Sequence, residues 1–172
     1  MRIFALVVAA SLALAGPVLA AKAPQVTSIS TLAELQTPLP FPYDEKADAN
    51  KTVDAALAKA KAEHKLAFID LGGNWCGDCR VLAAFMELPE IKAFVEAHYV
   101  VAVIDVGRFN KNLQIPSRWN STEAMKNGGV PAILVVDPVT NKLIDAGHIA
   151  ALEDARHMDP QGIADWIAQW AK

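Results

Sequence analysis

The chain has 172 residues, 53% of them hydrophobic, and carries 16 Lys and Arg against 19 Asp and Glu, for a formal net charge of −3. This length fits one domain with a substantial hydrophobic core. The slight acidic excess argues against a nucleic-acid surface, which needs clustered basic side chains, so we expect no nucleic-acid partner.

Residues 1–20 have the order of a secretory signal peptide. Arg2 precedes an uncharged apolar run over 3–14, and small residues end at Ala20. We expect cleavage near Ala20, with an uncleaved membrane anchor as the alternative. No cysteine lies near that position to support a lipoprotein anchor, and no later stretch is long and apolar enough to cross a bilayer. The sequence therefore predicts an exported protein without stable membrane insertion after cleavage.

Residues 21–48 contain four prolines and no sustained periodicity. They predict an extended N-terminal arm with one short strand or helix around 29–35. A single domain is expected over 49–172. It begins with a helix over 49–64, in which apolar residues recur at helical spacing, and continues with a buried strand over 66–71.

The rest of the domain alternates helices and strands. A helix is expected from Cys76 through Phe85, and Pro89 either kinks it or begins a separate helix. The β-branched run over 99–106 predicts a second buried strand. A long polar connection over 107–129 is followed by a hairpin with strands at 132–136 and 142–147. The closing helix places four apolar residues on one face: Ile163, Trp166, Ile167 and Trp170. This order predicts an α/β fold with a central mixed β-sheet flanked by helices on both faces.

The segment Trp75-Cys76-Gly77-Asp78-Cys79 holds the only two cysteines of the chain. A strand that runs into a helix beginning at Cys-x-x-Cys is a typical setting for thiol–disulfide chemistry. At the helix N-terminus, free N–H groups and the helix dipole stabilise a thiolate, so Cys76 is the candidate attacking thiol. Cys79, one turn later, would resolve the mixed disulfide.

Two other interpretations of the cysteine pair stay open. One is a structural disulfide that never turns over, although a three-residue spacing closes a very small loop and stabilises the fold little. The other is half of a zinc site, which would need two more ligands. The four histidines show no paired spacing, so we expect no metal here.

Four ordered features resemble the thioredoxin superfamily, from about residue 49 to the C-terminus. A Trp-Cys-x-x-Cys site follows a strand, and Asp70 stands six residues before Cys76. Val130-Pro131 precedes a strand, and Gly147 ends the following one. The resemblance implies a thioredoxin fold and thiol–disulfide oxidoreductase activity with no prosthetic group.

The resemblance also implies roles for the other site residues. Asp70, whose pKa burial would raise, would accept a proton from Cys79; the alternative is a strand-end carboxylate that faces water. Pro131 would form a cis peptide packed against the cysteines, and Val130 would offer its backbone to a client chain. An ordinary strand start is the alternative for Pro131. Trp75 would shield the site and shape the docking surface, with core packing as the alternative.

The chain departs from the family pattern at two positions. Asp78 replaces the familiar proline between the cysteines, and its charge would raise the pKa of Cys76, with Arg80 as an offset. Val101 stands where many members carry a lysine across from the buried acid, which would leave Asp70 poorly partnered.

The connection over 107–129 is the expected region of client specificity. Asp105, Arg108 and Trp119 are candidates for lining the substrate groove. A solvated loop is the alternative for Arg108 and Trp119.

Together with the signal peptide, these features predict a periplasmic enzyme that reduces protein disulfides. The reducing direction rests on Trp75 and Asp70, which match the reducing branch of the superfamily. The expected partners are protein thiol or disulfide clients and a membrane electron-transfer protein that supplies reductant. The alternatives are an oxidase that introduces disulfides, and a non-catalytic thioredoxin-like binding module or copper(I) chaperone, since soft thiolates suit copper(I).

Overall fold

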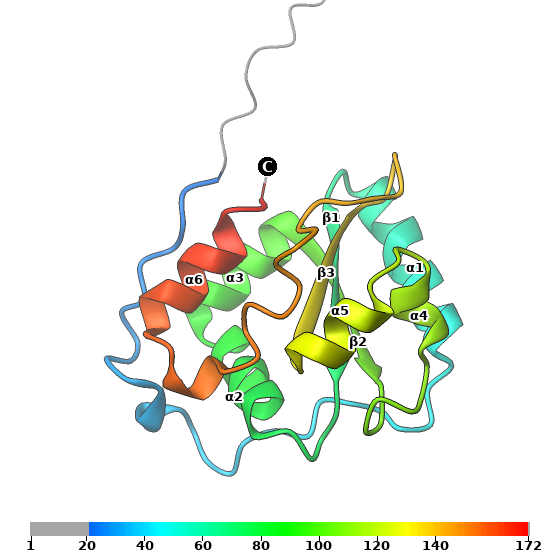
Figure 1. Cartoon of the computed structure of the whole chain (residues 1–172). Coiled ribbons are helices and arrows are strands. Elements are labelled where there is room, and N and C mark those ends of the chain that lie inside the picture. Colours follow the sequence, from blue (N-terminus) through cyan, green and yellow to red (C-terminus); the bar gives the residue numbers. More distant parts are fainter. Residues whose placement is uncertain (1–20, 172) are drawn as a thin grey trace, which may run out of the picture.

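The computed structural model describes residues 21–171, and the expected signal peptide lies outside them. The centre of the molecule is a four-stranded sheet in the order β2-β1-β3-β4 (Figure 1). β1 (Leu66–Gly72) runs parallel to β2 (Tyr99–Asp105) and antiparallel to β3 (Ala132–Asp137), which pairs with the short antiparallel strand β4 (Lys142–Leu143). The sheet is therefore mixed, and this confirms the predicted fold class.

β1 is buried at all seven of its positions, because helices cover both of its faces. A strand points successive side chains to opposite faces, so Asp70 lies on the same face as Phe68. In the strand register Asp70 is opposite Val103 of β2 and Ile133 of β3. The only acid of this strand therefore lies between apolar neighbours, near the end of the strand that leads to the cysteines.

Three helices cover one face of the sheet: α1 (Ala49–Ala62), α4 (Gln114–Ser117) and α5 (Thr122–Gly128). Asp48 caps α1, since its side chain accepts a hydrogen bond from the Lys51 N–H at 3.1 Å. The buried side chains that these helices turn toward the sheet include Val53, Ile115 and Met125. They form one of the two apolar cores.

The opposite face is covered by α2 (Gly77–Met86), α3 (Pro89–His98) and α6 (Pro160–Ala168), which lie together on one side of the sheet in Figure 1. Pro89 is at the start of α3, so the proline begins a separate helix rather than kinking one long helix. The second apolar core lies between these helices and the sheet. It includes Phe68, Phe85, Ile91 and Ile163.

The N-terminal arm packs on the domain. It runs past α6 and α3 and then passes below the N-terminal end of α2 (Figure 1). Its one short helical element is the 3-10 helix η1 (Leu32–Glu34), and Ile29 and Leu35 on either side of it are buried in the second core. Glu90 of α3 anchors the arm by accepting hydrogen bonds from two backbone N–H groups, those of Thr27 and Ser28.

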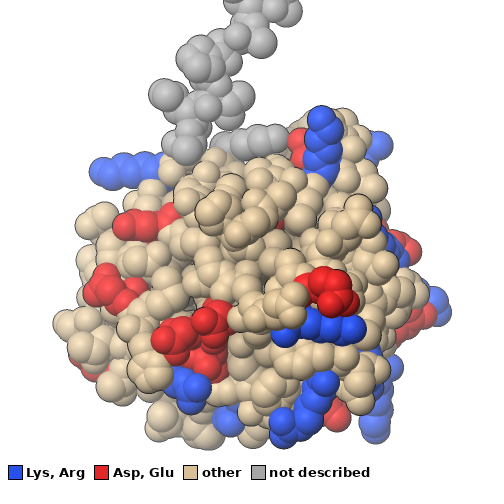
Figure 2. All heavy atoms as spheres, in the orientation of Figure 1, with Lys and Arg blue, Asp and Glu red and all other residues tan. Residues whose placement is uncertain are grey.

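Two segments differ from the sequence prediction. The region over 107–129 contains α4 and α5 rather than a polar loop alone. The second hairpin strand is Lys142–Leu143 rather than 142–147, because the carboxylate of Asp145 replaces the strand ladder by accepting from the Val135 N–H at 2.9 Å. Among residues 21–171, no helix is long and apolar enough to span a membrane. On the face shown in Figure 2, acidic and basic side chains are interspersed.

Candidate active site

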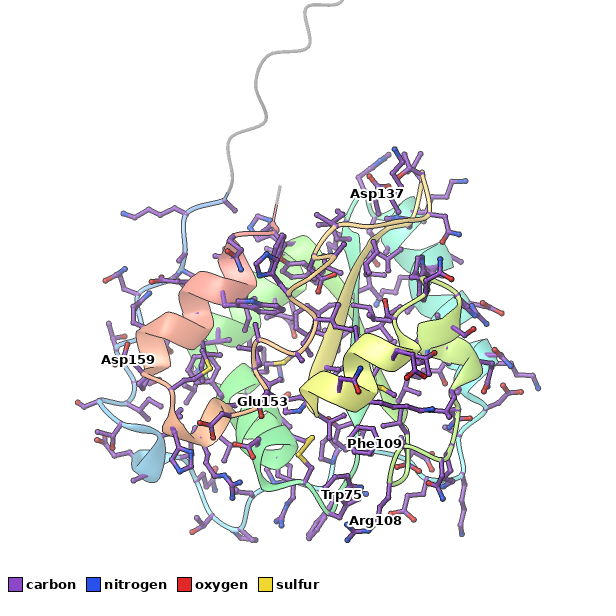
Figure 3. All side chains as sticks on the ribbon, viewed as in Figure 1. Trp75, Arg108, Phe109, Asp137, Glu153 and Asp159 are labelled. Atoms are coloured by element: carbon purple, nitrogen blue, oxygen red, sulfur yellow. A yellow bond between two sulfur atoms is a disulfide. The ribbon has the colours of Figure 1, made fainter. Side chains whose placement is uncertain are left out.

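Cys76 and Cys79 form a disulfide at the N-terminal end of α2 (Figure 3). Cys76 is the N-cap residue of the helix. Its Sγ accepts a hydrogen bond from the Cys79 N–H at 3.1 Å, and its own N–H donates to the Gly73 carbonyl at 3.0 Å. Cys79 is fully buried, whereas Cys76 keeps 5% of its surface exposed. The less deeply buried sulfur, which faces helix N–H groups, is suited to nucleophilic attack, and the fully buried sulfur one turn later is suited to resolution.

The Val130–Pro131 segment lies against the disulfide. The peptide bond between these residues is cis, and the Val130 carbonyl oxygen is 3.3 Å from Cys76 Sγ. β3 begins directly afterwards, at Ala132. Gly129, on the other side of Val130, has a φ of +104° and lies against Glu153, so an acidic side chain stands beside this edge of the site (Figure 3).

Trp75 lies on the other side of the disulfide, with 44% of its surface exposed. Its indole Nε1–H donates to the Gly107 carbonyl at 2.7 Å. The Arg108 guanidinium stacks over the ring at 4.7 Å, and Phe109 packs edge-on at 6.3 Å (Figure 3). Trp75 is thus a fixed, exposed aromatic surface beside Cys76 rather than part of the core.

Asp70 is a buried acid, with only 2% of its surface exposed. The Tyr43 hydroxyl donates a hydrogen bond to its Oδ1 at 2.9 Å. Burial raises the pKa of Asp70 to about 7, although the Tyr43 hydrogen bond acts in the opposite direction. A side chain at Gly72 would collide with the Tyr43 hydroxyl and would lie 2.8 Å from Cys79 Sγ. Tyr43, Asp70 and the buried sulfur therefore share one small space behind the disulfide.

The carboxylate of Asp78, between the two cysteines, is paired with a residue far along the chain. Arg156, in the 3-10 helix η2 (Ala155–His157), donates its backbone N–H and its Nε–H to Asp78 Oδ1 at 3.0 and 3.1 Å. A second guanidinium nitrogen lies 2.9 Å from Asp78 Oδ2. The partner of the Asp78 carboxylate is therefore Arg156 and not the neighbouring Arg80. Arg80 instead donates to arm carbonyls, those of Leu39 and Pro40.

The three candidate groove residues have different positions. Asp105 is buried, and it holds the following loop by accepting from the Gly107 N–H at 3.0 Å and pairing with Lys111 at 2.7 Å. Arg108 lies on Trp75, at the site. Trp119 does not reach the site, because its indole N–H donates to Asn141 in the β3–β4 turn, at the opposite end of the sheet from Trp75.

Comparison with known proteins agrees with this geometry. The family model described as thioredoxin-like matches residues 48–138, more than half of the chain. The chain belongs to the thioredoxin-like family. A solved disulphide isomerase from Xylella fastidiosa Temecula1 superposes with a TM-score of 0.69 at 37% identity, covering 76% of this chain and 96% of that protein.

A curated relative, a thioredoxin H-type protein of Chlamydomonas reinhardtii, is 42% identical over 40 residues. The match covers 23% of this chain and 35% of that protein, so this chain spans about a third of the relative's length. The thioredoxin-like fold and the Cys76–Cys79 pair together support thiol–disulfide oxidoreductase chemistry.

Sequence reasoning missed two residues of this thioredoxin-like site. Tyr43 lies in the arm, 27 residues before Asp70, and Arg156 lies 78 residues after Asp78. No local pattern marks either residue, since only the tertiary fold brings them to the cysteines. In residues 21–171 we find no group of three or more His, Cys, Asp or Glu side chains arranged to hold a metal ion.

Proposed function

We propose that the protein reduces disulfides of client proteins outside the cytosol. The observation that supports this most directly is the placement of the cysteines. Cys76 caps a helix beside the Val130 backbone, and Cys79 is fully buried, close to an acid whose pKa is about 7. A structural disulfide would need neither a sulfur at a helix N-terminus nor a titratable group behind it.

The proposed reaction has two steps. The Cys76 thiolate attacks one sulfur of the client disulfide, which forms a mixed disulfide and releases the other client sulfur as a thiolate. Cys79 then loses its proton, and its sulfur attacks Cys76 Sγ. This second step releases the remaining client sulfur and forms the Cys76–Cys79 disulfide. The client gains two electrons and two protons, and the protein dithiol is oxidised.

The reduced state must then be regenerated. A membrane electron-transfer protein that exchanges disulfides with Cys76 would supply electrons outside the cytosol. The Asp70–Tyr43 pair fits the reducing direction, because a buried base near Cys79 favours the second step. Export rests on the signal-like residues 1–20. Detection of a mature N-terminus near Ala21 in the periplasmic fraction tests this part.

A second candidate function is disulfide isomerisation. It is favoured by the similarity to the solved disulphide isomerase, which matches over 96% of that protein's length. An isomerase leaves the client before Cys79 resolves the mixed disulfide, so it needs only Cys76. The test compares Cys79→Ser with the unaltered protein. Under the reductase proposal Cys79→Ser traps the client, whereas an isomerase would still rearrange a scrambled disulfide protein.

A further inference from the structure

We propose that Tyr43, from the N-terminal arm, is a positioning residue for the resolving step: its hydroxyl holds the Asp70 carboxylate beside Cys79 so that this carboxylate can take the Cys79 proton. The inference rests on the proposed function, and it deepens that function by adding a residue outside the Cys-x-x-Cys segment.

The first support is the geometry of the hydroxyl group. Tyr43 is 2% exposed, and its Oη–H donates to Asp70 Oδ1 at 2.9 Å. The same hydroxyl and Cys79 Sγ both border the space that a Gly72 side chain would fill. Gly72 therefore leaves the room in which the hydroxyl, the carboxylate and the sulfur come together.

The second support is that the arm is fixed without this hydroxyl. Asn74 donates to the Tyr43 carbonyl at 2.8 Å and accepts from the Tyr43 N–H at 3.1 Å. Arg80 binds the carbonyls of Leu39 and Pro40 and stacks on Phe41. Since these contacts already hold the backbone of Tyr43 and the residues just before it, the Tyr43 hydroxyl is not needed to fix the arm.

The third support is the charge state of the pair. Burial and the Asp70 charge raise the pKa of Tyr43 far above its usual range, with a smaller effect from Asp105, so the hydroxyl remains a donor. Asp70 is the group of the pair that titrates near neutral pH. A hydrogen bond to a buried carboxylate favours the charged form, which is the form that accepts a proton.

A route for the proton to solvent is also present. Asp70 lines a cavity of about 620 Å³ at the outer edge of β2, together with Pro42 of the arm and Val103. The charged side chains around this cavity are Lys59, Glu63, Lys65, Glu87, Lys92 and Glu96. They are three cations and three anions, and the shift of the Asp70 pKa comes from burial and the Tyr43 hydrogen bond.

The step is balanced within the dithiol reaction. Cys79 Sγ gives its proton to the Asp70 carboxylate as it forms the bond to Cys76 Sγ. The Cys76–client bond breaks, and the electron pair leaves on the client sulfur. Asp70 then returns its proton to solvent through the cavity. Tyr43 exchanges no proton in this scheme; it keeps Asp70 ionised and in place.

The test is stopped-flow reaction of the reduced protein with a substoichiometric amount of 5,5′-dithiobis(2-nitrobenzoate) from pH 5.5 to 9. The first release of thionitrobenzoate reports attack by Cys76, and the second, concentration-independent release reports resolution by Cys79. We expect Tyr43→Phe to move the pH midpoint of the second phase upward by about one unit, which lowers its rate about tenfold at pH 6 and leaves it near that of the unaltered protein at pH 9.

Tyr99→Phe is the matched control. Tyr99 is the other tyrosine of the chain and is also buried. It lines the same cavity as Asp70, but the substitution removes only its hydroxyl, which donates to the Ile167 carbonyl at 2.6 Å. Its removal should leave both phases and their pH dependence unchanged. In Asp70→Asn the second phase should be slow at every pH, and adding Tyr43→Phe should slow it no further.

Coincident pH profiles for Tyr43→Phe and the unaltered protein would overturn the inference and leave the proposed function intact. Absence of the second phase in the unaltered protein would instead overturn the proposed function, and this inference with it. One readout needs no Tyr43 variant: the ¹³Cζ NMR signal of Tyr43 in the reduced protein should titrate with a midpoint near 7, and should lose this titration in Asp70→Asn. A Tyr43 signal that is independent of pH would contradict the proposal.

Discussion

Arg156 binds both carboxylate oxygens of Asp78 in the first turn of α2, across 78 residues of sequence. Asp78 is buried, with 6% of its surface exposed, and the guanidinium group also lies against Gly77. The negative charge between the two cysteines therefore has a positive charge directly beside it. Arg80 makes its hydrogen bonds elsewhere, with the arm carbonyls of Leu39 and Pro40.

The first prediction concerns this pair. Arg156→Met removes the positive charge and leaves Asp78 unpaired, so the pKa of the Cys76 thiol should rise by about one unit. The measurement is the rate of Cys76 alkylation by iodoacetamide as a function of pH in the reduced protein. Arg118→Met is the control, because Arg118 pairs with Asp54 on α1. An unchanged Cys76 profile in Arg156→Met would show that the pair is only structural.

A second prediction follows from the raised pKa of Asp70. The folded-state pKa of about 7 exceeds the ordinary value of 3.8, so the folded protein loses stability as pH rises between these values. Asp70→Asn should be as stable as the unaltered protein at pH 4 and up to about 4 kcal/mol more stable at pH 8, since one pKa unit is worth about 1.4 kcal/mol. Urea unfolding of the oxidised forms at pH 4, 6 and 8 measures this.

Asp145→Asn separates stability from catalysis. Asp145 is also buried, burial raises its pKa to about 7, and its Oδ1 accepts from the Val135 N–H. Like Asp70→Asn, this variant should gain stability relative to the unaltered protein as the pH rises from 4 to 8. It should leave the rate of resolution by Cys79 unchanged. A slower resolving step in Asp145→Asn would mean that the kinetic effect of Asp70 is not specific to its place beside the sulfur.

The exposed Trp75 surface gives a prediction about clients. Trp75→Ala removes the ring between Arg108 and Phe109, and should slow reduction of a protein disulfide about tenfold, the usual scale for a central aromatic contact. The rate with 5,5′-dithiobis(2-nitrobenzoate) should change less than about twofold, since so small a disulfide has little surface to dock. If both substrates react more slowly by the same factor, Trp75 acts on the reactivity of Cys76 and not on the docking of clients.

Arg80 gives a prediction about the arm. Arg80→Met removes the hydrogen bonds to Leu39 and Pro40, and hydrogen bonds to charged groups contribute about 1.5–3 kcal/mol each. The free energy of unfolding should fall by an amount of this order. Limited proteolysis should cut the arm of the variant sooner than the arm of the unaltered protein. Lys51→Met is the control, because Lys51 forms only an exposed pair with Asp48. Unchanged proteolysis would show that other contacts suffice to hold the arm.

Much of the fold could be predicted because its elements carry local signals. The buried strands are continuous apolar runs, and Pro89 can occupy the first turn of a helix, as it does in α3. α4 and α5 could not be predicted, since they are short, and in α5 only Met125 is buried. The second hairpin strand is shorter than predicted because the side chain of Asp145 takes the place of backbone pairing.

In the site, as in the fold, the residues that carry a local sequence signal could be predicted. Cys76, Cys79 and Asp70 lie within ten residues and follow one strand, so spacing alone brings them together. Tyr43 and Arg156 complete the site from distant segments, and a single sequence has no feature that connects them to the cysteines. Trp119 was a wrong candidate because its segment turns away toward the β3–β4 turn.

The reduction potential of the Cys76–Cys79 pair tests the central proposal most directly. The protein is equilibrated in glutathione buffers of known ratio, and the fraction oxidised is followed by thiol alkylation and gel shift. The proposed reductase should have a potential near the roughly −270 mV of thioredoxin. A potential near −120 mV, that of a strong oxidant, would contradict the proposal and indicate an enzyme that introduces disulfides.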